Sequence, residues 1–335
     1  MTETTVRFGL FVPQGWRLDL VGIDPALQWD TMRSLAQRAD AGPWESVWVY
    51  DHFHTVPEPT TEATHEAWTL MAAVAAVTTR VRLGQMCSCT GYRNPAYLAK
   101  VAATVDIVSG GRTEMGIGAG WYEHEWRAYD YGFPGAGQRL AMLREGVEIM
   151  KQLWTDGVSS YAGEHYRTDG AICRPLPLQE GGIPLWVAGG GERKTLRIAA
   201  EHARYTNFDG TLEGFTHKSE VLAGHCRDLG REFGSITRSA NYNVVVGRDE
   251  AEVADRLAQR RDRLGGLVST EALEREGASA SPDLPCVGTP EQIVDKLRPL
   301  VAAGMTYPIL YFPEAAYDTS GIELFEREVV PALQG

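Results

Sequence analysis

The stretch "IPLWVAGGGERKTLRIAAEHARYTNF", residues 183–208, decides the fold of this chain. Its first part, 183–188, is apolar and predicts a buried strand, and three glycines follow at once. A helix is then expected over 192–202 and a short second strand over 203–208. A strand, a helix and another strand in so short a stretch are typical of the βαβ unit of a parallel sheet.

The same alternation runs along almost the whole chain. Further apolar strands are expected over 6–12, 46–51, 81–87, 112–119, 241–247 and 306–312. Helices are expected over 25–40, 65–78, 94–108 and 138–154, after the N-cap Thr289, and over 321–333. Eight strand-then-helix units favour an α/β fold, a single (β/α)8 TIM barrel that spans 1–335 as one domain. An open, doubly wound sheet is the alternative, because this periodicity does not show closure. The widest irregular stretches, 156–182 and 265–289, are expected as inserted loops at the barrel mouth.

Composition limits the classes of function. The 335 residues are 44% hydrophobic and 23% charged, which is typical of a globular protein. A formal charge of −12 argues against binding to nucleic acid or to an anionic membrane. No apolar run approaches the roughly 20 residues that span a bilayer, and the first residues lack a secretory signal. Five cysteines without a disulfide pattern favour a reducing compartment, so we expect a cytoplasmic location.

In a barrel of this kind the active site gathers at the carboxyl ends of the strands. Small, aromatic and titratable residues follow the expected strands here, as a flat ring lying against backbone would require. They are Trp16, Asp51, His52, His54, Cys87, Ser88, Cys89, Gly118, Ala119, Gly120, Trp121, Gly189, Gly190 and Gly191, with Glu123 and His124 close behind.

The triple glycine predicts a phosphate site. Free N–H groups at the start of a helix, together with its dipole, form an anion cradle, and Arg193 adds a charged donor. The alternative is a tight turn that needs glycine only for its backbone angles.

Two other interpretations are weaker. The G-x-G-x-G run at 116–120 follows the fourth expected strand, whereas a dinucleotide fingerprint follows the first strand of its unit. We therefore expect its glycines to permit close backbone approach. His52 and His54 alternate to opposite sides of a continuing strand, and no further ligand pair appears, so no metal is expected.

Five motifs in the same order resemble the bacterial luciferase-like superfamily, in its branch that uses the deazaflavin coenzyme F420. They are "YDHF" (50–53), "LGQMCSCTGYRNPAYLAK" (83–100), "GRTEMGIGAGWYEHEW" (111–126), the stretch 183–208 and "GTPEQIVDKL" (288–297). The resemblance covers about residues 6–313.

This resemblance implies a deazaflavin held in a cleft at the strand ends, in a protein that is usually a homodimer. It implies a non-proline cis peptide near Met86–Cys87 and a phosphate grip over 189–193. The implied cofactor-binding residues are Asp51, Met86, Cys87, Ser88, Cys89, Gly118, Ala119, Gly120, Gly189, Gly190, Gly191, Glu192 and Arg193. The candidate catalytic residues are His52, Asp51 and Glu123, and the candidate substrate pocket comprises Trp16, His54, Trp121 and His124.

The expected function is therefore hydride transfer between F420 and a small organic substrate, with reduction of an activated C=C or C=N bond. Sugar-phosphate dehydrogenases of this branch carry a glutamate where this chain has Trp121, which argues against a sugar phosphate. One alternative is an FMN-dependent two-component monooxygenase, and another is a non-catalytic flavin-binding relative. The sequence names neither the substrate nor the direction of hydride transfer.

Overall fold

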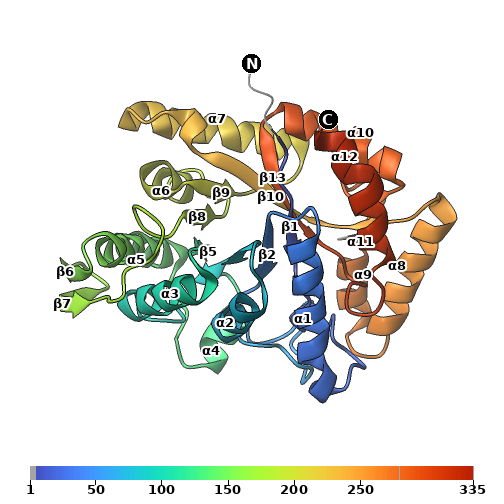
Figure 1. The fold of residues 1–335 in the computed structure, drawn as a ribbon, viewed down its shortest axis with the longest axis horizontal. Coiled ribbons are helices and arrows are strands. Elements are labelled where there is room, and N and C mark those ends of the chain that lie inside the picture. Colours follow the sequence, from blue (N-terminus) through green and yellow to red (C-terminus); the bar gives the residue numbers. More distant parts are fainter. Residues whose placement is uncertain (1–4, 279, 335) are drawn as a thin grey trace.

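Eight parallel strands close into a barrel that helices surround (Figure 1). The computed structural model describes residues 5–278 and 280–334. Pairing of Leu83 with Thr113 joins the third and fourth barrel strands and closes the ring. Closure excludes the open sheet and confirms the predicted barrel. The strands are β1 (Gly9–Phe11), β2 (Ser46–Val49), β3 (Arg82–Gln85), β5 (Thr113–Gly118), β8 (Leu185–Ala188), β9 (Tyr205–Asn207), β10 (Thr237–Asn243) and β13 (Met305–Tyr311).

The outer helices begin where the sequence provides caps. Asn94 accepts a hydrogen bond from the Ala96 N–H, and Thr289 forms a capping box with Gln292, so both predicted starts are confirmed. Two of the outer helices, α7 and α8, were not predicted from the sequence. The outer helices are α1 (Pro25–Ala41), α2 (Ala67–Val77), α3 (Pro95–Ser109), α5 (Ala136–Thr155), α6 (Thr195–His202), α7 (Leu212–Leu229), α8 (Glu250–Leu264) and α10 (Pro290–Ala302), and α11 (Ser320–Leu324) and α12 (Val330–Gln334) end the chain.

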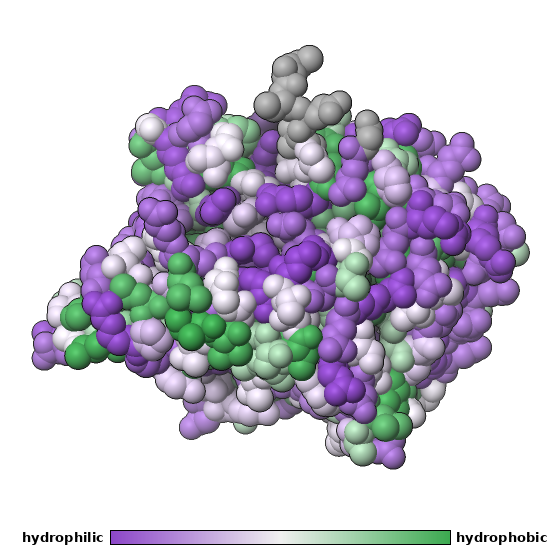
Figure 2. Space-filling model, in the orientation of Figure 1, coloured by the Kyte–Doolittle hydropathy of each residue, from purple (hydrophilic) through white to green (hydrophobic). Residues whose placement is uncertain are grey.

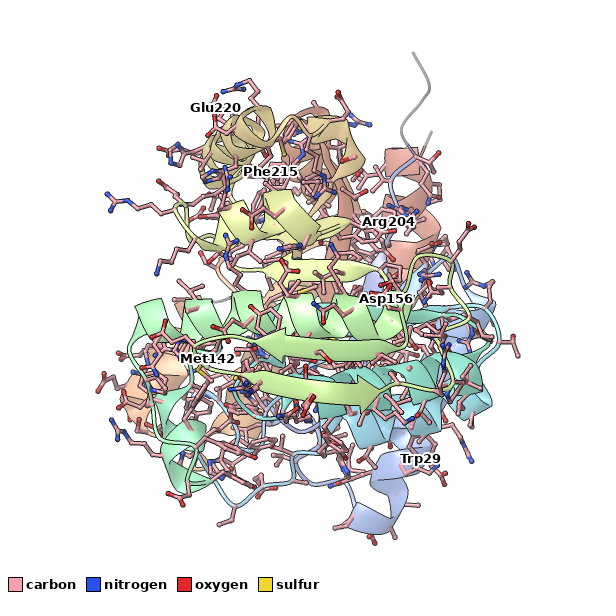
Figure 3. The ribbon with its side chains drawn as sticks, turned by 90° about the vertical axis from the view of Figure 1, so that its left-hand side faces the viewer. Trp29, Met142, Asp156, Arg204, Phe215 and Glu220 are labelled. Atoms are coloured by element: carbon pink, nitrogen blue, oxygen red, sulfur yellow. The ribbon has the colours of Figure 1, made fainter. Side chains whose placement is uncertain are left out.

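Both stretches expected to be irregular contain regular elements. Within 156–182, β6 (Val158–Ala162) and β7 (Arg167–Ile172) form an antiparallel hairpin alongside α5 (Figure 3). Within 265–289 lie α9 (Thr270–Ala278) and β12 (Val287–Gly288). β12 pairs with β11 (Val245–Val246) in a separate small sheet. The strand predicted over 241–247 is therefore wrong in its bounds, since the chain leaves the barrel after Asn243.

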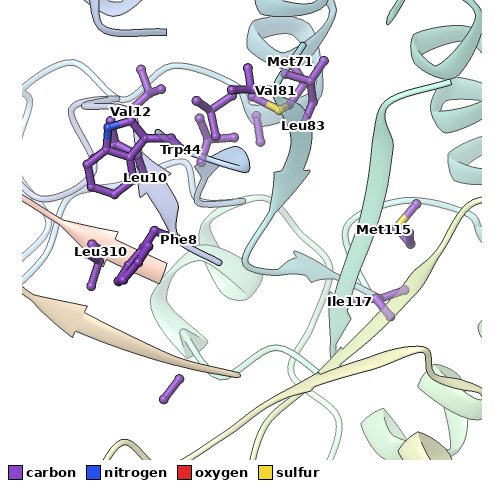
Figure 4. Packing of buried hydrophobic residues seen from close by; sticks show 14 of the residues in the cluster. Phe8, Leu10, Val12, Trp44, Met71, Val81, Leu83, Met115, Ile117 and Leu310 are labelled. Carbon is purple, nitrogen blue, oxygen red and sulfur yellow. The ribbon is translucent and has the colours of Figure 1, made fainter. Parts of the chain in front are cut away.

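The core has two layers that follow from strand alternation. On β5, Met115 and Ile117 pack outward with the aliphatic side chains that lie under the helices (Figure 4). Glu114 points inward, where its carboxylate accepts the Trp186 Nε1–H at 2.8 Å. The barrel interior is rich in aromatic rings, and Trp48 meets Trp186 edge to face with centroids 4.7 Å apart. Aromatic side chains thus fill the lower part of the barrel.

Two surface features bear on function. Apolar side chains gather on the face that carries α3 and the β6–β7 hairpin (Figure 2), and Tyr97, Val108, Ile172 and Leu178 are exposed. A short helix, α4 (Glu123–Ala128), lies beside the barrel mouth.

Among the described residues, no helix is both long and apolar enough to cross a bilayer.

Candidate active site

A cavity of about 400 Å³ opens at the carboxyl ends of the barrel strands. Of the predicted site residues, it brings together Trp16, Asp51, His52, Met86, Cys87, Cys89, Gly118, Ala119, Gly120, Trp121 and Gly189. The sequence analysis did not single out the remaining lining residues, which are Tyr50, Tyr92, Ala188, Thr195, Asn207 and Asn241. A larger cavity, of about 620 Å³, lies between α8 and α9, away from all of these residues.

The His52 ring is held by aromatic neighbours. It stacks in parallel on the Trp16 indole, with centroids 4.2 Å apart and an interplanar angle of 4°. Trp121 and Tyr122 meet it edge to face at 5.7 and 5.8 Å. These contacts restrict rotation of the imidazole and keep it in the wall of the cavity.

Glu125 is the hydrogen-bond partner of His52. Its Oε2 lies 2.8 Å from His52 Nδ1 and accepts the Tyr92 hydroxyl at 2.6 Å, while its Oε1 accepts the Phe53 and His54 N–H groups at 2.6 and 2.8 Å. Burial raises the pKa of this carboxyl, but the hydrogen bonds from His52 and Tyr92 outweigh burial and lower it below its usual range. An ionised Glu125 accepts a hydrogen bond from Nδ1–H of His52, and Nε2 is the ring nitrogen that takes no part in this contact.

Asp51 organises the ends of two strands. Its carboxylate forms a bidentate ion pair with Arg93, at 2.7 and 2.8 Å, and accepts the Cys89 N–H at 2.9 Å. Although burial lowers the pKa of Arg93, Asp51 and Glu66 raise it above its usual value. Because both oxygens of Asp51 are committed, its side chain supports the wall of the cavity and is not poised to transfer a proton.

The end of strand three carries the predicted distortion. The Met86–Cys87 peptide is cis, as the resemblance implied. Burial, aided by Asp51, raises the pKa of the Cys87 thiol to about 12, so this side chain is a neutral wall and not a nucleophile. Ser88 points away from the cavity, where its hydroxyl accepts the Trp68 Nε1–H at 3.2 Å.

The glycines at the end of β5 permit the close approach that the sequence predicted. A Cβ on Gly116 would collide with the Gln85 carbonyl, and one on Gly118 would lie 2.6 Å from Cys87 Sγ. A Cβ on Gly120 would collide with Cys89 Sγ. The G-x-G-x-G run therefore lets β5 pack directly on the end of strand three, and it gives the cavity a flat side.

The triple-glycine loop lies at another end of the cavity, beside Thr195. Gly189 has φ +112°, and its N–H donates to the Asn207 carbonyl at 2.8 Å. No hydrogen bond among the described residues uses the N–H groups of Gly190 and Gly191. The helix α6 begins at Thr195, later than predicted. These free amides fit the predicted anion site.

The charged residues of this loop point away from the cavity. Glu192 pairs with Lys218 of α7 at 2.6 Å and with His217 at 2.9 Å, and Arg193 is exposed to solvent. Lys218 also lies next to Gly190, because a Cβ there would be 3.4 Å from Lys218 Cε. Lys218 was not among the predicted site residues, because α7 was not predicted from the sequence.

Besides Ser88 and residues 190–193, three further predicted residues lie outside the lining of the cavity, and they are His54, Glu123 and His124. His54 Nδ1 faces His124 Nδ1 at 2.9 Å on the surface, and Glu123 forms an exposed ion pair with Arg127 at 2.6 Å. The turn of α4 instead buries Glu125 next to the buried Trp126. The position of that tryptophan is the one sequence signal that marks residue 125 as facing inward. No cluster of three or more potential metal ligands occurs in the part of the chain that the structure describes.

Known proteins resemble this chain in sequence and in architecture. The family model described as luciferase-like monooxygenase matches residues 6–307. An F420-dependent glucose-6-phosphate dehydrogenase of Nocardia farcinica is 29% identical over 330 residues, which cover 90% of this chain and 93% of that protein.

Solved structures agree in fold. An F420-dependent secondary alcohol dehydrogenase, in complex with an F420-acetone adduct, superposes with a TM-score of 0.79 at 20% identity and covers 99% of this chain and 100% of its own. The F420-dependent tetrahydromethanopterin reductase from Methanopyrus kandleri gives 0.76 at 20% identity, with 98% and 99% covered. At this identity the likeness shows the fold alone. The match of the family model over nearly the whole chain establishes that the protein belongs to the luciferase-like monooxygenase family.

Proposed function

We propose that this chain is an oxidoreductase that moves a hydride between coenzyme F420 and a small organic substrate. One observation carries the proposal: a single cavity is lined by His52 and also by Gly189, from which a loop with free amides continues. The relatives named above support F420 as the coenzyme.

The residues present fit such a ring compound with a phosphate. Met86, Cys87 and the backbone at Gly118 would hold a flat ring, and the amides of Gly190 and Gly191 would hold the phosphate. When bound, the coenzyme supplies or accepts the hydride. The protein supplies orientation, exclusion of water and a proton.

His52 is the group that we assign to proton transfer. Reduction of a C=C or C=N bond needs a hydride at one atom and a proton at the other, and His52 Nε2 can deliver the proton. The negative charge of Glu125, at 2.8 Å from Nδ1, stabilises the protonated imidazole before the transfer. Solvent then returns a proton to His52, so protons and electrons balance over one turnover.

The cavity disfavours a phosphorylated substrate. Among the described residues that line it there is no lysine or arginine, which a sugar phosphate would need as partners. Trp121, 62% exposed, instead presents a large ring at the cavity. A flat or apolar electrophile fits these walls better than glucose 6-phosphate does.

Turnover by the purified protein tests this proposal. Chemically reduced F420 is mixed anaerobically with a panel of activated alkenes and imines, and the return of oxidised coenzyme is followed by absorbance. We expect oxidation of reduced F420 with members of this panel, and no reduction of oxidised F420 by glucose 6-phosphate. Oxygen-dependent turnover with reduced FMN would instead establish the monooxygenase alternative, and tight F420 binding without any turnover would favour a non-catalytic relative.

We also infer that two copies pair through the face that carries α3 and the β6–β7 hairpin. Tyr97 of α3 is 62% exposed and Ile172 of β7 is 68% exposed, and apolar patches of this kind mark association sites. Sedimentation of the purified protein should give a dimer, and Val108→Glu with Ile172→Lys should give a monomer. A wild-type monomer at micromolar concentration would refute the pairing.

A further inference from the structure

A second cavity lies outside the barrel, between α8 and α9. Figure 1 shows these two helices on the right-hand side of the molecule. Its volume of about 620 Å³ falls in the range of roughly 300–1,000 Å³ that small-molecule sites occupy. No residue that lines it lines the cavity at the barrel mouth. Its apolar wall includes Leu257, Leu264, Leu273 and Ala280.

The helix α9 has little core of its own. Ala272 is its one buried residue, and Leu273 lies half-buried in the wall of the cavity. Polar contacts hold the segment to the barrel instead, because the N–H of Ser269 donates to Glu58 at 2.8 Å and Glu276 pairs with Arg17 at 3.2 Å. A helix this short is marginal without apolar packing. An apolar ligand in the cavity would supply the packing that α9 lacks.

One end of the cavity carries a buried arginine with spare hydrogen-bonding capacity. Arg260 is more than nine-tenths buried, and its guanidinium contacts the Glu276 carboxylate, which Arg17 contacts as well. Arg260 Nη1 has no hydrogen-bond partner among the described residues. Two guanidinium groups thus share one glutamate, and the orphaned atom is a donor. Such a position calls for an acceptor, preferably an anionic one.

We propose that the cavity between α8 and α9 binds a small amphipathic carboxylate, of the kind that a medium-chain fatty acid represents. Its carboxylate accepts from Arg260 Nη1, while Nη2 keeps its contact with Glu276. Its apolar chain lies along Leu257, Leu264 and Leu273. The proposal stands on this cavity alone and does not rest on the proposed reaction.

The cavity has a structural connection to the barrel mouth. Glu276, which lines it, is paired with Arg17, and Arg17 follows Trp16 in the chain. The Trp16 ring is the one that stacks on His52 at 4.2 Å. Occupancy of the α8–α9 cavity is therefore positioned to affect the wall of the active site.

Calorimetric titration with decanoate tests the proposal, with decan-1-ol as the uncharged counterpart. The purified full chain should bind one decanoate at least about tenfold more tightly than decan-1-ol, because a hydrogen bond to a charged group is worth more than a neutral one. Arg260→Met should remove that preference, and Leu273→Trp, which fills the cavity, should weaken both ligands. Arg275→Met is the matched control, because Arg275 is an exposed arginine on α9. This variant should change the affinity for neither ligand.

Hydrogen exchange gives a second readout that is independent of activity. Decanoate should slow amide exchange over 270–278 in the wild type and in Arg275→Met, but not in Leu273→Trp. Equal affinities for decanoate and decan-1-ol, no binding of either, or decanoate binding that survives both Arg260→Met and Leu273→Trp would overturn the proposal. If Arg260→Met does not unfold cooperatively, this variant is misfolded and its affinities carry no weight. Leu273→Trp, at a half-buried position, then decides whether decanoate binds in this cavity.

Discussion

Nδ1 of His52 and Oε2 of Glu125 lie 2.8 Å apart, and the carboxylate is fully buried. The contact joins the end of β2 to α4, the short helix after β5. It fixes which imidazole nitrogen carries the proton, because an ionised carboxylate accepts only from a protonated nitrogen. The proposed chemistry therefore depends on a residue that never touches the cavity itself.

Replacing Glu125 with glutamine tests this dependence. The amide keeps the shape of the side chain but cannot balance a protonated imidazole, so we expect kcat to fall about 10- to 100-fold. The pH profile of kcat should change, and the affinity for F420 should stay the same. Glu123→Gln, at an exposed position of the same helix, is the control and should leave all three quantities unchanged. A Glu125→Gln enzyme with the wild-type pH profile would exclude a positioning role.

A second prediction concerns the ion pair of Asp51 and Arg93. Asp51→Ala leaves the Arg93 guanidinium largely buried beside an empty space, and breaking such a pair costs about 3 kcal/mol of unfolding free energy. Asp30→Ala, which removes an exposed partner of Arg33, should cost less than about 1 kcal/mol. Urea unfolding of both variants measures these costs. Equal costs for the two variants would show that the buried pair has no special weight.

Local patterns predicted the barrel because each strand-then-helix unit carries its own periodicity and caps, as at Asn94 and Thr289. They failed where pairing is decided at a distance. Val245 belongs to an apolar run that directly follows β10, yet it pairs with Val287 outside the barrel. In residues 156–182, no local sequence pattern indicated the hairpin of β6 and β7.

For the candidate site too, the sequence located the residues whose positions depend on the local pattern and did not locate the others. Residues that directly follow a strand, such as His52 and Gly118, lie where the fold must place them. Glu123, His124 and Glu125 are equally polar neighbours in sequence, and only the turn of α4 decides which of them is buried. Asn207 and Asn241 line the cavity from strands whose ends the sequence located less well.

The glycine run at the end of β5 provides a third prediction. Gly118→Ala places a methyl group 2.6 Å from Cys87 Sγ, and overpacking of this kind costs about 1–3 kcal/mol. The variant should also lose affinity for F420, since the wall of the cavity must move. Gly137→Ala on α5, where the added methyl group would meet Lys194 Nζ at an ordinary contact distance of 3.8 Å, should instead stabilise the protein by about 0.5–1 kcal/mol. Thermal unfolding and coenzyme titration of both variants check this, and wild-type behaviour of Gly118→Ala would contradict the close packing.

A fourth prediction concerns pH. Burial raises the pKa of Glu314 to about 7, although Arg256 at 3.5 Å opposes the shift. Between about pH 4.5 and pH 7 the folded chain keeps a proton that the unfolded chain has released, so stability falls as pH rises through this window. The loss amounts to about 3 kcal/mol at roughly 1.4 kcal/mol per pKa unit.

Glu314→Gln removes this titration. The variant should match the wild type near pH 5 and lose less stability between about pH 5 and pH 7.5. Urea unfolding at the two pH values measures the difference. Parallel curves for the two proteins would show that Glu314 titrates elsewhere.

The identity of the coenzyme is the claim on which the proposed function depends most, and fluorescence titration of the purified chain tests it directly. Oxidised F420 and FMN are added separately, to the wild type and to His52→Ala. The structure predicts saturable binding of F420 by both proteins, at least about tenfold tighter than FMN, with turnover lost only in His52→Ala. Tighter binding of FMN, or no binding of F420 at all, would contradict this assignment.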